Sequence, residues 1–194
     1  MREQSQQNDK KHADFTWDKL GDICEGRQVL GEEMPVLVYR LFQYSMNDVL
    51  HHELGAEQAY RLFRRAGHLA GEEYAKNNLP LDAAFNEFVA ALQKSLLELK
   101  IGILRVEAAD LAAGRLTLTV SEDLDCSGLP PSGEVVCNYD EGFIAGILET
   151  YAHTPFEVRE IDCWATGDRV CRFSVIREDG QRLVGAAPGS PAER

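Results

Sequence analysis

Two cysteines near the C-terminus, Cys163 and Cys171, are spaced so that they could bind one metal ion. Residues on either side of Gly167 alternate in hydrophobicity, which predicts a β-hairpin with its turn at that glycine. In such a hairpin Cys163 lies directly across from Cys171, and Ile161 lies across from Phe173. Opposed residues have Cβ atoms about 4.5 to 5.5 Å apart. Two thiolates at that separation favour zinc, which prefers four ligands when its role is structural.

The spacing of this pair is also compatible with two arrangements that contain no metal. Buried cysteines are common as small hydrophobic side chains, and two cysteines on neighbouring strands can form a disulfide. The chain has 5 cysteines, and an odd number in a cytoplasmic protein is more typical of thiols or metal ligands than of disulfides. The interval between Cys163 and Cys171 is not a standard zinc-finger interval, so spacing alone does not choose among the three arrangements.

A longer part of the sequence favours the metal site. The segment from Cys137 to Gly146, then Pro155, then the segment from Glu160 to Phe173 resemble the 4-vinyl reductase domain family, also called the hydrocarbon-binding domain. Phenol-sensing members of this family bind zinc with a Cys and, 23 residues later, a Glu-x2-Cys-x7-Cys cluster; this sequence matches every interval. The resemblance covers about residues 27–177 and implies a structural zinc held by Cys137, Glu160, Cys163 and Cys171.

The strand geometry raises one difficulty for this ligand set. Glu160 and Cys163 are an odd number of residues apart, so a regular strand would point them to opposite faces of the sheet. Either a β-bulge intervenes, or the site lies where the strand begins and the adjoining loop can turn. Cys126 precedes a Gly/Pro loop and fits no position of the family pattern, so it is left outside the predicted site. Cys24 is predicted to be a lone thiol.

Three amphipathic helices are predicted before the strands that carry these residues. The first begins after Pro35 and stops at Gly55, and its apolar residues recur with helical spacing. The second covers about residues 56–77, and the third follows Pro80 with Asp82 as its N-cap. Gly67 and Gly71 lie four residues apart in the second helix, where each costs about 1 kcal/mol of helix propensity. A close approach of another backbone or of a ligand would explain both.

The period then changes from helical to twofold, which predicts strands. A first hairpin is expected near residues 101–120, and a fourth helix capped by Asp140 ends before Pro155. The second hairpin spans residues 156–177. The predicted fold class is therefore α+β, with an antiparallel sheet of about four strands, helices packed mainly on one face, and a zinc-supported C-terminal hairpin. Residues 14–178 form one ligand-binding domain in this interpretation, between disordered tails at 1–13 and 179–194.

The composition excludes some classes of partner. The chain has 20 Lys plus Arg against 32 Asp plus Glu, a formal net charge of -12, which repels nucleic-acid phosphates and anionic lipid surfaces. No apolar stretch approaches the roughly 20 residues needed to span a bilayer, and the N-terminus has no apolar signal core. We therefore expect a cytoplasmic protein with no membrane span and no direct contact with nucleic acid.

The family resemblance also implies a hydrophobic cavity between the helices and the sheet. In the phenol-sensing members of the family, a His just before the first strand and a Trp on the second strand recognise the ligand hydroxyl. Here those regions are Leu97-Glu98-Leu99 and the aromatic-free segment 116–121, which argues against phenol and leaves a longer hydrocarbon, a lipid or a tetrapyrrole open. Side chains that could line the cavity or orient a ligand, most of them equally explained as core, are His68, Tyr74, Phe85, Phe88, Phe143, Tyr151 and Trp164.

These observations favour a binding role over catalysis. We expect a small-molecule sensor or carrier domain that binds a hydrophobic ligand, contains structural zinc and is not an enzyme. A zinc with four protein ligands leaves no open position for a substrate, and no dinucleotide-binding motif is present. The alternatives are an assembly protein resembling subunits of the transport-particle (TRAPP) complexes, or a reductase of tetrapyrrole metabolism. Related folds imply a homodimer, and a sensor of this size would need a separate signalling partner.

Overall fold

The computed structural model describes residues 15–179, which belong to two compact units divided after Glu33. The described part of the first unit contains a 3-10 helix, Trp17–Leu20, and one turn of helix, α1 (Ile23–Gly26), whose N-cap Asp22 accepts a hydrogen bond from the Glu25 backbone. Residues 1–13 and 180–194, where tails are predicted, lie outside the described residues. None of the helices at residues 15–179 is long and apolar enough to cross a membrane.

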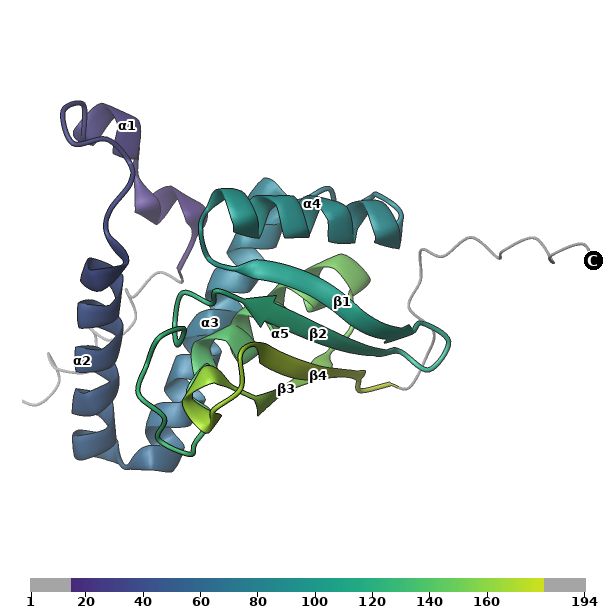
Figure 1. The fold of residues 1–194 in the computed structure, drawn as a ribbon. Coiled ribbons are helices and arrows are strands. Elements are labelled where there is room, and N and C mark those ends of the chain that lie inside the picture. The colour runs from purple at the N-terminus through teal and green to yellow at the C-terminus, as the bar shows by residue number, and fades with distance from the viewer. Residues whose placement is uncertain (1–14, 180–194) are drawn as a thin grey trace, which may run out of the picture. The chain divides into compact units, whose positions relative to one another are not determined.

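The second unit contains a four-stranded antiparallel sheet. Its strands β1 (Ile103–Asp110), β2 (Arg115–Ser121), β3 (Phe156–Asp162) and β4 (Cys171–Arg177) lie in the order β1-β2-β4-β3 (Figure 1). Alternate residues of the two central strands are buried, including Leu118 on β2 and Phe173 on β4, whereas the neighbouring Thr119 and Ser174 are partly exposed. One face therefore belongs to the core, and the predicted α+β class and four antiparallel strands are confirmed.

The pairing of β3 with β4 contains a β-bulge, one of the two alternatives that strand parity left open. The register shifts between Glu160 and Asp162, so that Glu160, not Ile161, pairs with Phe173. The predicted pairing of Ile161 with Phe173 is wrong, because the bulge leaves Ile161 without a position in the register. Glu160 lies on the buried face by ordinary alternation with Phe156 and Val158, and the bulge after it allows Cys163, an odd number of residues further on, to be buried as well.

Four longer helices accompany the sheet: α2 (Val36–Leu54), α3 (Ala56–Asn78), α4 (Phe85–Glu98) and α5 (Asn138–Ala152). All four match predicted helices, but two predicted caps are wrong. The N-cap of α4 is Ala84 rather than Asp82, and the N-cap of α5 is Cys137, which places Asp140 within the first turn. Helices α4 and α5 contribute apolar side chains to the buried face of the sheet, and α3 packs against α5.

Glycines bring α3 and α5 into backbone contact. A Cβ atom added to Gly67 or Gly71 would lie under 3.0 Å from a backbone carbonyl of α5, and one added to Gly142 or Gly146 would meet a carbonyl of α3 in the same way. The contact is reciprocal, because each helix contributes two glycines one turn apart. The expectation of a close backbone approach at Gly67 and Gly71 is confirmed.

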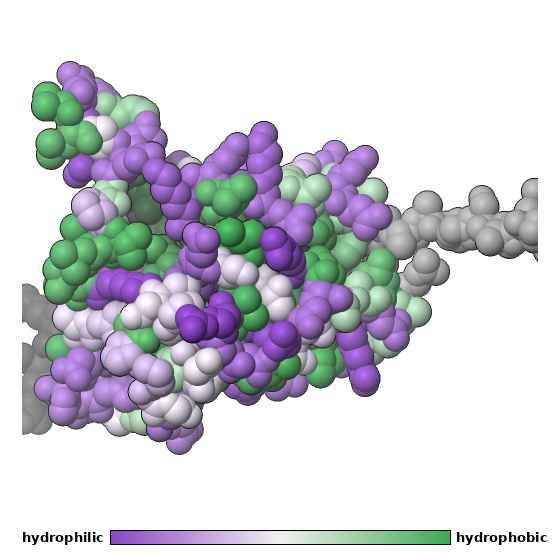
Figure 2. Space-filling view, in the orientation of Figure 1, coloured by the Kyte–Doolittle hydropathy of each residue, from purple (hydrophilic) through white to green (hydrophobic). Residues whose placement is uncertain are grey.

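Helix α2 has its polar side toward the rest of its unit and its apolar side outward. Tyr39 and Gln43 bind Asp125, and Arg40 donates to backbone carbonyls of the same loop. On the opposite side Leu37 is 67% exposed and Leu41 is 63% exposed. Figure 2 shows hydrophobic side chains gathered over the N-terminal half of this helix. The apolar periodicity correctly predicts a helix here, but its apolar stripe does not enter the core.

The free edge of β3 is bonded to side chains of the helices. Glu149 accepts a hydrogen bond from the Phe156 backbone at 3.1 Å, and Glu141 accepts one from the Glu160 backbone at 2.8 Å. Between them Arg64 donates to the Val158 carbonyl at 3.4 Å. These bonds fix β3, and with it the start of the segment that carries Cys163, against α3 and α5.

Candidate metal centre and adjoining cavity

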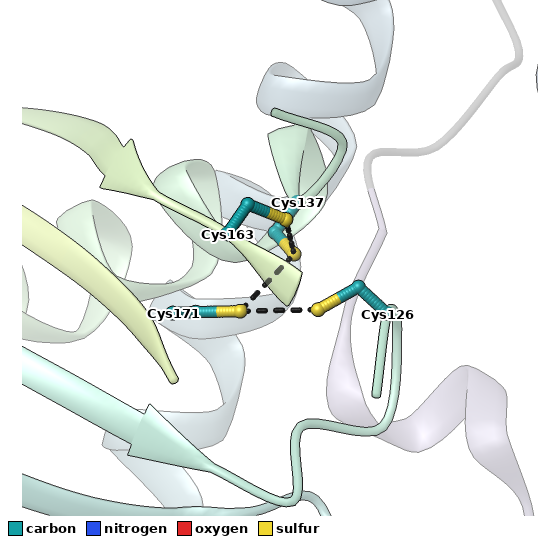
Figure 3. A group of neighbouring side chains, drawn as sticks. All are labelled: Cys126, Cys137, Cys163 and Cys171. Carbon is teal, nitrogen blue, oxygen red and sulfur yellow. Dashed lines mark hydrogen bonds between the residues drawn. The ribbon is translucent and has the colours of Figure 1, made fainter. Parts of the chain in front are cut away.

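Four cysteines from separate parts of the second unit meet beside the end of the sheet (Figure 3). Cys126 lies in the loop after β2, Cys137 precedes α5, Cys163 follows β3, and Cys171 begins β4. All four are free thiols and are buried, with at most 1% of their surface exposed. Three of them belong to the predicted ligand set, and Cys126 does not.

The sulfur positions fit a single tetrahedral ion. Cys137 Sγ is 3.9 Å from Cys163 Sγ and 3.8 Å from Cys171 Sγ, and Cys126 Sγ is 3.1 Å from Cys171 Sγ. All four sulfurs lie within 4.8 Å of one another. Zinc–sulfur bonds of about 2.3 Å in a tetrahedron separate the sulfurs by about 3.8 Å. The residues present therefore fit a zinc ion held by four thiolates, with only small movements of the side chains.

A tight turn places Cys126 in this group. Asp123 Oδ1 accepts hydrogen bonds from the backbone N–H groups of Asp125 at 2.8 Å and Cys126 at 3.1 Å, which folds the chain back on itself. Arg40 on α2 then binds the carbonyls of Leu124 and Ser127 on either side of the cysteine. Nothing in the spacing of the cysteines signals this turn, so Cys126 is the site residue that sequence reasoning missed. Asp123, three residues before Cys126, is the local sequence feature that could have predicted this turn.

Glu160, the remaining residue of the predicted set, lies against the cysteine group. Its Oε2 atom accepts a hydrogen bond from the Cys137 backbone at 3.0 Å. Its Oε1 atom is buried and has no hydrogen-bond partner in the described part of the chain. Burial and the neighbouring Cys163 raise the pKa of Glu160 to about 8. An unpartnered carboxylate oxygen beside thiolates would be satisfied by a cation.

The thiols influence one another's ionisation strongly. Hydrogen bonds from Cys126, Cys137 and Cys171 lower the pKa of the Cys163 thiol, since a first thiolate is stabilised by its thiol neighbours. The pKa of Cys137 and the pKa of Cys171 are raised, in each case first by the contact with Cys126. A metal ion reverses this trend, because its charge deprotonates every thiol that coordinates it.

An apolar cavity adjoins the cysteine group between α4, α5 and the sheet. Its volume is about 30 Å³, which is room for roughly one or two water molecules. Leu92 and Leu96 of α4 and Ile147 of α5 line it, and Asp123 and Asp140 stand at its polar end. Asp123, Asp140 and the Cys137 sulfur lie within 4.8 Å of one another, so the cavity and the cysteine group share this wall.

Asp140 contributes an unpaired acceptor to the cavity wall. Its Oδ2 atom is buried and has no hydrogen-bond partner among residues 15–179. Burial and the nearby Asp125 raise the pKa of Asp140 well above its usual range. A carboxyl oxygen accepts a hydrogen bond in either protonation state, so this atom offers a fixed polar contact at the end of an apolar space.

The structure places the predicted ligand-binding residues in several environments. Phe143 lines the cavity. Phe88 stacks on Tyr151 at a centroid distance of 4.0 Å with Phe85 beside them, and the Tyr74 ring packs on Phe143 while its hydroxyl bonds Ser95. His68 lies 2.8 Å from Glu149, at a surface groove on the α3–α5 side.

Trp164 holds the loop that joins two of the clustered cysteines. Its indole N–H donates to the Leu129 carbonyl at 3.0 Å, and Arg169 lies over its ring. Ser132 and Gly133 donate backbone hydrogen bonds to the Ala165 carbonyl in the same region. These contacts tie the segment between Cys126 and Cys137 to the turn after β3.

Known structures share this fold. A vinyl-4-reductase family protein from Methanocaldococcus jannaschii is 18% identical with a TM-score of 0.58, and the match covers 85% of this chain and 98% of that one. The phenol-responsive sensory domain of the transcription activator PoxR, solved with phenol, is 16% identical with a TM-score of 0.58, over 77% and 80% of the two chains. A trafficking protein particle complex subunit 3 from Naegleria fowleri, bound to palmitic acid, is 15% identical with a TM-score of 0.59, over 76% and 96%.

The similarity to the trafficking complex subunit confirms the expected relationship in fold. The most specific match is to the family model of the 4-vinyl reductase domain, over residues 116–177. That segment contains β2, α5, β3, β4 and all four clustered cysteines. Over this segment, the chain is therefore similar to this domain family.

Proposed function

We propose that the protein is a ligand-binding domain, a sensor or carrier, in which a structural zinc ion supports one wall of a cavity for a hydrophobic small molecule. The observation that carries this proposal is the shared wall between the two sites. Asp123 lines the cavity, and its Oδ1 atom lies 3.9 Å from Cys137 Sγ while fixing the turn that carries Cys126. The metal would order this wall, because ion and fold are stabilised together.

The sulfur geometry favours Cys126, Cys137, Cys163 and Cys171 as the four zinc ligands. Glu160, expected from the family resemblance, is the alternative to Cys126 as the fourth ligand. In the sulfur-only arrangement Glu160 orients Cys137 through the backbone hydrogen bond. A closed four-ligand site supplies structure rather than a position for substrate, which favours binding over catalysis.

The cavity suits a ligand with an apolar body and one hydrogen-bond donor. Its walls are aliphatic and aromatic, and Asp140 Oδ2 is the acceptor at its end. An anionic head group is disfavoured there by the neighbouring Asp123 and Asp125. A molecule larger than one or two waters must displace α4 or α5 outward, so ligand entry would change the packing of these helices.

Native mass spectrometry of protein purified without chelator, with elemental analysis, tests the proposal. We expect one zinc per chain and an additional small-molecule mass that is lost on denaturation. Leu92→Trp, which fills the cavity, should remove that mass and retain the zinc, and the retained zinc reports that the variant is folded. Reduced protein without metal would contradict the zinc site, and a bound mass unaffected by Leu92→Trp would contradict the cavity as its location.

The outward face of α2 favours assembly as a second candidate role. Leu37, Val38, Leu41 and Val49 are each about half to two-thirds exposed on this helix. Exposed apolar surfaces of this kind mark protein interaction sites, and a second copy of the chain is the partner we propose. Light scattering of the wild type and of Leu41→Glu tests it: a dimer that becomes monomeric supports the proposal, and a monomeric wild type contradicts it.

A further inference from the structure

A second apolar site lies outside the sheet-side cavity, in a groove between α2 and α3. Its volume is about 380 Å³, within the range of small-molecule sites in proteins. Phe42 and Met46 of α2 and Leu62 and Phe63 of α3 form its walls. No charged side chain lines it in the part of the chain that the structure describes, so it suits a neutral molecule.

One buried polar side chain, Gln43, lines this groove. It is 9% exposed, and its Nε2 atom donates to Asp125 Oδ2 at 2.6 Å. That bond fixes the orientation of the amide, because a carboxylate oxygen accepts and the amide nitrogen donates. The Oε1 atom is left buried and without a hydrogen-bond partner among residues 15–179. A buried acceptor in this state destabilises the folded protein unless a donor reaches it.

We propose that the groove between α2 and α3 binds a neutral, apolar small molecule that donates one hydrogen bond to Gln43 Oε1. The apolar walls hold the body of the ligand, and the fixed amide selects a hydroxyl or N–H group over an ether or a hydrocarbon. Leu37 and Leu41 on the outward face of α2 are not among the residues that line the groove.

Such a ligand would also be linked to the cysteine group through two residues, Gln43 and Asp125. Gln43 holds the side chain of Asp125, and Tyr44 donates to the Asp125 carbonyl at 3.1 Å. Asp125 directly precedes Cys126. Occupation of the groove would therefore restrain the loop that carries this thiol, even though the ligand itself does not reach the sulfur.

A matched pair of probes tests the proposal: 4-tert-butylcyclohexanol and its methyl ether. Binding is followed by the methyl NMR signal of Met46, one of 3 methionines in the chain, assigned with Met46→Leu. We expect the alcohol to shift this signal and to bind roughly tenfold more tightly than the ether, the effect of one hydrogen bond to a buried acceptor. Gln43→Met should bring the two affinities together while the ether's affinity is unchanged.

Ala66→Trp fills the groove from an exposed position on α3 and should abolish binding of both probes. Ala56→Trp, on the same helix but outside the groove, is the matched control and should bind normally. Equal affinities of the alcohol and the ether for the wild type, or binding that survives Ala66→Trp, would overturn the proposal. If neither probe binds and Ala66→Trp turns a dimer into a monomer, the groove holds a second copy and the proposal is wrong.

Discussion

The backbone of Gly142 on α5 lies directly against the backbone of Arg64 on α3. A Cβ atom on Gly142 would lie under 3.0 Å from the Arg64 carbonyl oxygen, a distance that real Cβ atoms essentially never show. Backbone atoms cannot move aside as a flexible side chain can. The separation of these two helices is therefore set by the absence of a side chain, and everything that α5 positions depends on it.

Gly142→Ala should destabilise the protein by at least about 2 kcal/mol, because the added methyl forces the two helices apart. Chemical denaturation measures the change. Gly26→Ala is the matched control, since this helical glycine has open space around its Cβ position and should change stability by about 1 kcal/mol or less. Equal effects of the two substitutions would show that the α3–α5 contact is not close.

The two candidates for the fourth zinc ligand make opposite predictions. We expect Cys126→Ser to lower the zinc content and the melting temperature, because it removes a sulfur that lies 3.1 Å from Cys171 Sγ. Glu160→Gln should retain zinc, since its amide oxygen still accepts the Cys137 N–H. Elemental analysis decides between them: zinc lost from Glu160→Gln and kept by Cys126→Ser would make Glu160 the ligand. The exposed Cys24→Ser is the control for thiol substitution.

Metal removal should loosen a defined part of the second unit. Chelation under reducing conditions should lower the melting temperature, because zinc binding contributes directly to folding. Hydrogen exchange should rise first in the loop around Cys126 and in the turn between β3 and β4, which contain Cys126 and Cys163 and lead to Cys171 at the start of β4. The α3–α5 contact, held by glycine packing, should keep its protection. Uniform loss of protection would argue against a local structural role for the metal.

The His68–Glu149 pair predicts a pH dependence of stability. The hydrogen bond to Glu149 raises the pKa of His68 above 6.5, although partial burial and Arg64 oppose the shift; Glu72 reinforces it. A raised pKa means that the stabilisation is complete below the ordinary value and is lost as pH rises through the folded-state value. Melting temperatures at about pH 6 and about pH 8.5 should differ more for the wild type than for His68→Gln. If the melting temperature changed by the same amount between the two pH values in the wild type and in His68→Gln, the pair would not titrate in this range.

The sequence predicts the elements of this fold well because periodicity reports which residues share a face. It does not report what covers that face. Apolar residues recur with helical spacing in α2 as they do in α4, yet Leu41 is 63% exposed while Phe88 is completely buried. The inward side of α2 is instead selected by long-range hydrogen bonds to Asp125, which no local pattern reveals.

In the candidate metal centre, too, local sequence patterns identify some residues, whereas long-range contacts position the others. Cys137, Cys163 and Cys171 could be named as candidate ligands from the sequence because their intervals match a family pattern. Two of them, Cys163 and Cys171, also lie across from each other in one predicted hairpin. Cys126 could not be named in this way, because its position depends on a turn that Asp123 closes and on Arg40 from a distant helix. The parity of Glu160 and Cys163 left two alternatives, a bulge or a site where the strand begins, and the structure has a register shift between Glu160 and Asp162.

The side chains that bond to the free edge of β3 limit how this protein can associate with other chains. Three outward backbone groups of β3, the N–H groups of Phe156 and Glu160 and the Val158 carbonyl, are bonded to Glu149, Glu141 and Arg64, so an incoming strand would have to displace these side chains. The other edge strand, β1, is interrupted by a register shift between Val106 and Ala108. Bulges and covered edges prevent strands of other chains from joining a sheet. A continuous intermolecular sheet is therefore disfavoured at both ends, and partners of this domain are expected to recognise side chains rather than backbone.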